Sequence, residues 1–161
     1  MSELYAIIRI RGRVDVPPDV EYTLKLLRLH KKFHMVIYPS DLPGLKKMLL
    51  KVKDWVTWGE IDYNTLVEVL KRRGRLVGNK LLTDDIVGKL FAQQGISNIE
   101  DLAKAIFEGR IKLHKQSYIK PVFRLHPPQG GFKKSIKKPY GDGGVLGYRG
   151  RDINELIMKM I

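Results

Sequence analysis

The sequence predicts a small protein of mixed strands and helices that carries a long basic loop near its end. Three observations predict this fold class. Strand-like and helix-like apolar patterns alternate over residues 1–60, capped amphipathic helices follow over 61–108, and residues 109–151 are rich in Gly, Pro, Lys and Arg. The 161 residues suffice for one domain, or for a small domain with an appended part. We expect a core domain over 1–60, a helical extension over 61–108, a basic loop over 109–151 and a docking helix over 152–161.

The first 60 residues form a β-α-β-α-β unit. "LYAIIRIR" alternates as a strand does, with one wholly apolar face and with Arg9 and Arg11 on the other. "PPDVEYTLKLLRL" predicts a helix, because proline and acidic residues open it and apolar residues recur on one face. "FHMVIY" then predicts a short strand, "SDLPGLKKMLLKVK" a helix capped near Ser40 or Asp41, and "WVTWGEI" a third strand.

Three short helices follow this unit. "DYNTLVEVLKRRG" and "TDDIVGKLFAQQG" each end at a glycine, and "SNIEDLAKAIFEG" begins with a capping box of Ser97 and Glu100. The closing "DINELIMKMI" predicts a helix whose apolar face must dock on another part of the chain. The basic segment before it is therefore tethered at both ends.

The charge is concentrated in that segment. Thirty Lys and Arg against 17 Asp and Glu give the chain a net charge of +13 and an isoelectric point near 9.9. Residues 109–151 hold eleven basic side chains and one acidic one, whereas 61–108 carry no net charge. A peptide that binds a membrane surface would place such charges along an amphipathic helix, but these lie among prolines and glycines. Nucleic-acid phosphate is therefore the expected partner.

Other classes of protein find little support in the sequence. No apolar run reaches the roughly 18 residues of a membrane span, and the first residues lack the pattern of a signal peptide. We therefore expect a cytoplasmic protein with no membrane partner. The sequence contains no cysteine, which excludes disulfides and thiolate metal sites.

Catalytic and cofactor motifs are incomplete. "HKKFH" spaces His30 and His34 as in zinc proteases, but the glutamate that should follow the first His is missing. "GRLVGNK" has the wrong spacing for a phosphate loop, and "GDGGVLG" follows no strand and lacks the dinucleotide-binding pattern. We expect no enzyme activity, no cofactor and no metal.

"GISNIEDLAKAI" allows another interpretation, a helix-hairpin-helix module that would hold a nucleic-acid backbone. Its hairpin, "QQGIS", has one glycine, and the surrounding residues have no net charge. Simple packing of a capped amphipathic helix is the favoured interpretation.

Several stretches together resemble a known family. "YTLKLLRLHKKFHMVI", "DLPGLKKMLLKVKDWVTWGEI", "HPPQGGFKKSIKK" and "GRDINELIMKMI" occur in the order and spacing of the archaeal form of the large-subunit ribosomal protein L-thirty family, called L-seven in eukaryotes. The resemblance implies an α+β fold, a small ferredoxin-like sandwich of three mostly antiparallel strands and two helices, with a helical extension and a long basic loop. The β-α-β order alone would favour a parallel pair.

The resemblance also implies a function. It indicates a structural protein of the large ribosomal subunit that binds large-subunit rRNA, with the 5S rRNA region and other large-subunit proteins nearby. Basic positions that match the family are Arg9, Arg11, Arg13, Arg28, His30, Lys31, Lys32, Lys133, Lys134, Lys137 and Lys138. The basic segment adds Arg124, His126, Arg149 and Arg151 as candidate rRNA-binding residues.

A Gly-rich and Pro-rich cationic segment suits a crevice in folded RNA. Its lysines neutralise phosphates and release counterions, and its glycines allow a close approach of the backbone. We expect the segment to be mobile without RNA, and Phe132, Tyr140 and Tyr148 either to stack on bases or to anchor the segment on the protein. The alternative functions are a stand-alone RNA-binding or RNA-chaperone protein and an RNA-modifying enzyme, of which the latter would need a cofactor pocket or an acid/base cluster.

Overall fold

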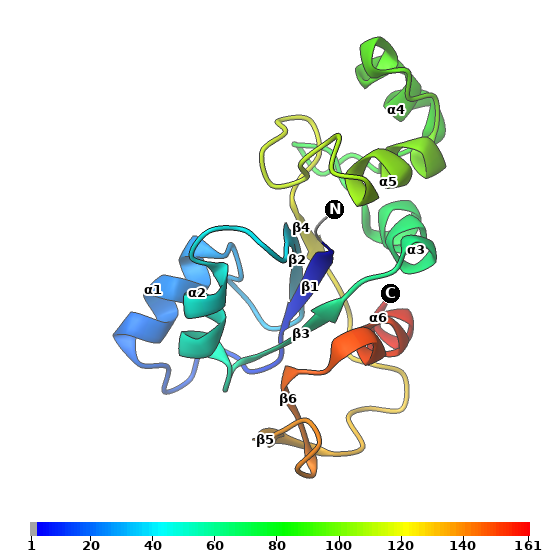
Figure 1. Ribbon diagram of the computed structural model, residues 1–161. Helices are drawn as coiled ribbons and strands as arrows, with labels where there is room; N and C mark the ends of the chain where they lie inside the picture. The colour runs from blue at the N-terminus through cyan, green and yellow to red at the C-terminus, as the bar shows by residue number, and fades with distance from the viewer. Residues whose placement is uncertain (1–2) are drawn as a thin grey trace.

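The computed structural model describes residues 3–161. It shows one mixed β-sheet with helices on both faces (Figure 1). The sheet has six strands in the order β4-β2-β1-β3-β6-β5. The strands are β1 (Leu4–Arg9), β2 (His34–Pro39), β3 (Val56–Glu60), β4 (Val122–Arg124), β5 (Ser135–Pro139) and β6 (Gly144–Tyr148). The helices are α1 (Pro18–Leu26), α2 (Leu45–Val52), α3 (Tyr63–Arg73), α4 (Asp84–Leu90), α5 (Ile99–Phe107) and α6 (Ile153–Met160), with short 3₁₀ turns at Ala92–Gln94 and Gly150–Asp152.

The three N-terminal strands pair antiparallel around β1, with Ile7 opposite Val36 on β2 and Trp58 on β3. The resemblance implied this pairing, and the parallel pair suggested by the β-α-β order was wrong. The reason lies at the end of β1, where the segments before and after α1 meet. The Phe33 amide donates to the Arg9 carbonyl at 2.7 Å, so β2 enters at the end where β1 leaves and must run in the opposite direction.

Strand alternation gives this sheet two apolar faces. Ile7 and Val36 point to the face that α1 and α2 cover. Ala6 and Ile8 point to the other face, where α3, α5 and α6 supply the apolar partners. Figure 1 shows the two groups of helices on opposite sides of the strands. The docking expected of the closing helix is therefore observed, since its apolar residues belong to the second core.

The fold is α+β, but the three-stranded sheet needs correction, because residues 109–151 contribute three more strands. β4 pairs antiparallel with β2, and β6 pairs parallel with β3. β6 buries Val145 and Leu146, which gives it a reason to join the sheet, whereas the lysines and proline of β5 remain exposed at the edge. Gly144 permits the close approach of β5, since a Cβ there would lie 1.8 Å from the Lys138 carbonyl oxygen. Much of the expected mobile loop is thus part of the sheet.

Two helix starts also differ from the sequence prediction. α2 begins at Leu45 after Gly44, because turns occupy residues 40–44, and neither Ser40 nor Asp41 caps it. At α5, Asn98 accepts the Asp101 amide at 2.8 Å in place of the expected Ser97 cap. Among residues 3–161, no helix is long and apolar enough to cross a membrane.

The core assignment predicts a contrast between two neighbouring leucines. Leu27 is 2% exposed and Leu26 is 55% exposed. Leu27→Ala should lower the free energy of unfolding by about 2 to 5 kcal/mol, because it leaves a cavity among buried side chains. The control Leu26→Ala should change it by less than about 0.5 kcal/mol. Chemical denaturation measures both, and equal midpoints for the two variants would show that the buried face of α1 is misassigned.

Candidate nucleic-acid interface

The clearest group of free cations is the lysine segment, Lys133–Lys138. Its four lysines are exposed at the outer edge of the sheet, two of them on β5. None forms an ion pair with any residue that the structure describes. In Figure 1, β5 and β6 lie at the end of the molecule away from α4 and α5. The lysine segment can therefore meet an external polyanion without first breaking an internal pair.

A second group lies where β2 begins, and we call it the β2 basic end: His30, Lys31, Lys32 and Arg124. All four side chains are exposed, and Arg124 lies opposite His34 in the β2–β4 register. Burial, and then the charges of Arg124, His30, Lys31 and Arg9, lower the pKa of His34 to about 4. Besides burial, the causes of this shift include several basic side chains near His34, and such a group at one end of the sheet suits phosphate.

Two candidate arginines bond to other parts of the protein, Arg9 fully buried and Arg149 half-buried. Arg9 has no exposed side-chain surface and donates to the carbonyl oxygens of Arg11 and Leu29 at 2.9 and 2.8 Å, with Glu21 at 3.4 Å. Arg9 lies on the face of β1 that α1 covers, which the alternation pattern did not reveal. Burial lowers its pKa, partly offset by Glu21. Arg9 therefore joins the loops at the end of β1 and does not present its guanidinium to an external ligand.

Arg149 also bonds to other parts of the protein. Its Nε donates to the Thr57 hydroxyl at 2.9 Å and a terminal nitrogen donates to the Val145 carbonyl at 2.7 Å. Its guanidinium also lies 4.6 Å from the centre of the Tyr140 ring, and burial lowers its pKa. Arg149 therefore attaches β6 to β3.

The remaining candidates are spread around the surface. Arg11 stacks over Trp55 at 5.0 Å, Arg28 donates to the His114 carbonyl at 3.1 Å, and Arg151 pairs with Glu3. Arg13 is exposed, and His126 is half-buried beside the Pro127 carbonyl. The structure does not gather these side chains at one place.

Phe132, Tyr140 and Tyr148 of the basic segment all contact other parts of the protein. Phe132 packs on Phe33 with the ring centres 6.2 Å apart, and the Tyr140 hydroxyl donates to Asp152. The Tyr148 hydroxyl donates to Glu60, and this hydrogen bond, followed by burial, raises the pKa of Tyr148 to about 12. These contacts agree with the anchoring interpretation of the three rings.

Sequence reasoning missed three cations that the fold brings beside Arg124. Arg73, Arg75 and Lys120 line a common cleft with it. Arg73 and Arg75 belong to residues 61–108, whose net charge is zero, so the charge of that stretch did not indicate a basic site. The basic run Lys71–Arg75 could have indicated them, but only the fold brings Lys120 near.

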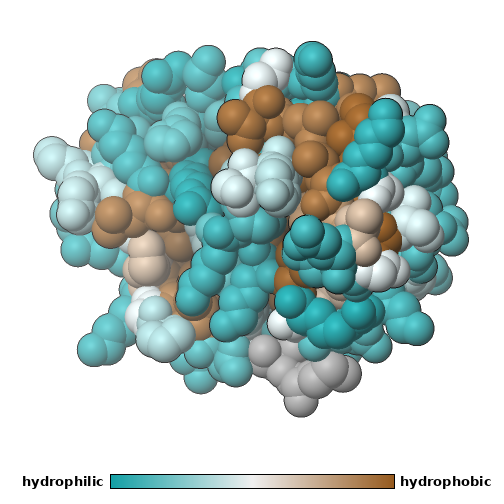
Figure 2. All heavy atoms as spheres, turned by 90° about the horizontal axis from the view of Figure 1, so that it is seen from above, coloured by the Kyte–Doolittle hydropathy of each residue, from teal (hydrophilic) through white to brown (hydrophobic). Residues whose placement is uncertain are grey.

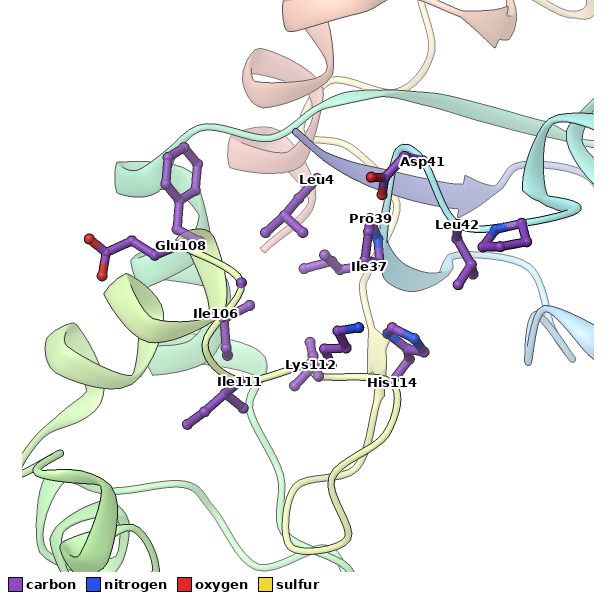
Figure 3. Close-up of a pocket in the computed structure, with 14 residues that line it drawn as sticks. Leu4, Ile37, Pro39, Asp41, Leu42, Ile106, Glu108, Ile111, Lys112 and His114 are labelled. Carbon is purple, nitrogen blue, oxygen red and sulfur yellow. The ribbon is translucent and has the colours of Figure 1, made fainter. Parts of the chain in front are cut away.

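Other surface features are less suited to RNA. A second hollow, of about 370 Å³, lies between the end of β2 and α5, and Figure 3 shows Leu4, Ile37 and Ile106 around it with Asp41 and Glu108. Its lining is mostly apolar, and its two carboxylates outnumber its one lysine, Lys112, so it attracts phosphate less than the cleft beside Arg124 does. Figure 2 shows hydrophobic side chains between hydrophilic ones on the face seen from above. Within the described part of the chain, no three potential ligands gather for a metal ion.

Fold and surface together define a basic α+β protein with cations displayed at both edges of one sheet. A family profile described as ribosomal protein L30p/L7e matches residues 5–56. The chain is 70% identical to the large ribosomal subunit protein uL30 of Staphylothermus marinus, over all of both chains. It is 66% identical to that of Hyperthermus butylicus, over 99% of this chain and 91% of the relative, and 62% identical to that of Desulfurococcus amylolyticus, over all of both.

The chain belongs to the L30p/L7e family of ribosomal proteins. The resemblance noted in the sequence is thus confirmed, and so is the expectation of a structural protein rather than an enzyme. The relatives carry the name of a large-subunit protein, which favours the ribosomal function over a stand-alone RNA chaperone.

The position of Arg9 predicts a stabilising role. Arg9→Met should lower the free energy of unfolding by about 1 to 3 kcal/mol, because buried acceptors such as the Leu29 carbonyl lose their donor. The control Arg13→Met, at an exposed position, should change it little. Thermal denaturation of the RNA-free protein measures the stability of both variants. If Arg9→Met leaves the stability unchanged, the stabilising role is wrong and Arg9 remains a candidate RNA-binding residue.

Proposed function

We propose that the protein stabilises folded rRNA of the large ribosomal subunit by presenting the lysine segment and the β2 basic end to backbone phosphates. It acts as a structural constituent of that subunit. Arg11, Arg13, Arg28, His126 and Arg151 are further candidate contacts spread over the surface, while Arg9 and Arg149 hold the loops that carry the two groups. The observation that carries the proposal is the lysine segment, with four exposed lysines that have no described acidic partner.

Electrostatics explains why these lysines suit rRNA. Each lysine that neutralises a phosphate releases condensed counterions, which favours binding and makes the affinity depend on salt. The segment can enter a crevice between RNA helices because β5 lies at the edge of the sheet with no further strand beside it. Tyr140 and Phe132 hold its ends on the protein, so less conformational entropy is lost on binding than for a free tail.

In this proposal each of the four parts of the chain has its own role. Residues 1–60 form the core, 61–108 cover its second face, 109–151 carry the RNA-binding lysines, and 152–161 dock the chain end. In the cytoplasmic ribosome the proposed partners are large-subunit rRNA, including the region of the 5S rRNA, and neighbouring large-subunit proteins. The charge of the basic segment and the names of the relatives support these partners.

Replacing the four lysines Lys133, Lys134, Lys137 and Lys138 by Ala tests the proposal. If each meets a phosphate, the slope of log affinity against log salt for refolded large-subunit rRNA should flatten by about 3 to 4 units. Thermal stability should hardly change, since exposed charges contribute little to folding.

A matched control removes four exposed lysines from α2, α4 and α5, namely Lys46, Lys47, Lys89 and Lys104. It should leave the slope nearly unchanged. An equal change in both variants would mean that only net charge matters, and an unchanged slope in the first would contradict the proposed contact.

A further inference from the structure

A cleft of about 360 Å³ lies beside the β2 basic end, and its lining is unusually cationic. The lining residues are Arg73, Arg75, Asn79, Lys120, Val122 and Arg124. Four of these six carry positive charge, and none is an Asp or Glu. Like charges placed this close repel one another, so an anion in the cleft would relieve an electrostatic cost.

The fold builds this cleft from three segments. α3 ends at Arg73, and Gly74 allows a tight exit, since a Cβ there would lie 2.4 Å from the Leu70 carbonyl oxygen. A short bridge then pairs Leu76 antiparallel with Ile119, and the Lys120 amide donates to the Arg75 carbonyl at 2.8 Å. Ile119 belongs to the buried core, so alternation turns its neighbour Lys120 toward the opposite side.

Few of the donors in the cleft are used inside the protein. Arg75 donates only to the adjacent Gly74 carbonyl, and Lys120 only to the Asn79 side chain at 3.2 Å. Arg73 donates one terminal nitrogen to the Ile161 oxygen at 3.0 Å, while its buried Nε has no partner among the described residues. Arginine donors arranged in this way suit an oxyanion with several acceptor oxygens.

Two neighbouring features favour nucleic acid as the source of that oxyanion. Arg124 lines the cleft and also belongs to the β2 basic end, so a phosphate chain could pass from one to the other. Val77 and Tyr118 lie next along the same bridge and are 68% and 48% exposed. An exposed apolar group beside cations fits the sugar and base that accompany each backbone phosphate.

We propose that this cleft binds a backbone phosphate of folded RNA. The site rests on the proposed rRNA-binding function and extends it to a third contact region, beside β4 at the opposite edge of the sheet from the lysine segment. Arg75 and Lys120 provide the donors that can be changed with least damage to the fold, because neither makes a long-range side-chain bond to the core.

The test compares two double variants of the full chain. Arg75→Gln with Lys120→Gln removes two cations from the cleft, and Lys80→Gln with Lys115→Gln removes two exposed cations from the same two segments outside it. With refolded large-subunit rRNA, the cleft variant should bind roughly tenfold more weakly at fixed salt and show a salt slope flatter by about 1 unit. The control should bind as the unchanged protein does. Equal behaviour of the two variants would overturn the site.

A second readout identifies the source of the anion. The NMR signals of the Arg73 and Arg75 Nε–H groups should shift on addition of the rRNA, and inorganic phosphate at the same phosphate concentration should not reproduce the shift. Full saturation by inorganic phosphate with no affinity loss in the cleft variant would mean a free-anion site and would overturn the proposal.

The outcome is separable from that of the proposed function. If the salt slope of the RNA affinity flattens in the four-lysine variant but not in the cleft variant, the cleft proposal fails and the proposed function stands. If the unchanged protein shows no preference for large-subunit rRNA over an unrelated transcript of equal length, the function itself fails.

Discussion

The need to cover the second apolar face of the N-terminal sheet governs the rest of the structure. α1 and α2 bury one face of β1, β2 and β3, but Ala6, Ile8, Met35 and Ile37 point the other way. Leaving those side chains in water would forfeit the main driving force of folding. The chain beyond residue 60 must therefore return across this face, which α3, α5 and α6 do. That return brings β4 to one edge of the sheet, and β6 with β5 beside it to the other.

The positions of the charges follow from this return. β4 brings Arg124 beside the exposed turn before β2, and β6 holds the lysine segment at the opposite edge. The buried Arg9 and the half-buried Arg149 attach the loops behind these two surfaces. Both edges are hydrogen-bonded into the sheet in this structure, so we expect less conformational entropy to be lost on RNA binding than for a disordered tail. The same architecture explains why a structural RNA-binding protein can display many unpaired cations on a stable core.

The sequence predicted local elements better than their partners. Apolar periodicity located the strands and helices of residues 1–60, and the charge distribution located the lysine segment. Strand direction needed the family resemblance, because β-α-β order alone favours the parallel arrangement. β5 and β6 were missed because glycines and lysines conceal the two buried residues, Val145 and Leu146, that hold β6 in the sheet. Arg9 was misplaced because alternation tells which residues share a face but not which helix covers it. The cationic cleft depends on contacts between distant segments, which no local pattern records.

Hydrogen exchange of the free protein tests the central claim that the sheet organises the basic segment before RNA binds. The Leu125 amide donates to Phe33 at 3.1 Å and the Arg149 amide donates to Trp58 at 2.9 Å, so they report the two places where β4 and β6 join the basic segment to the sheet. Both amides should exchange as slowly as those of β1, while the exposed turn at Gly141–Gly143 exchanges rapidly. Rapid exchange of Leu125 and Arg149 without RNA, followed by protection on binding, would contradict the account and show that rRNA itself folds the segment.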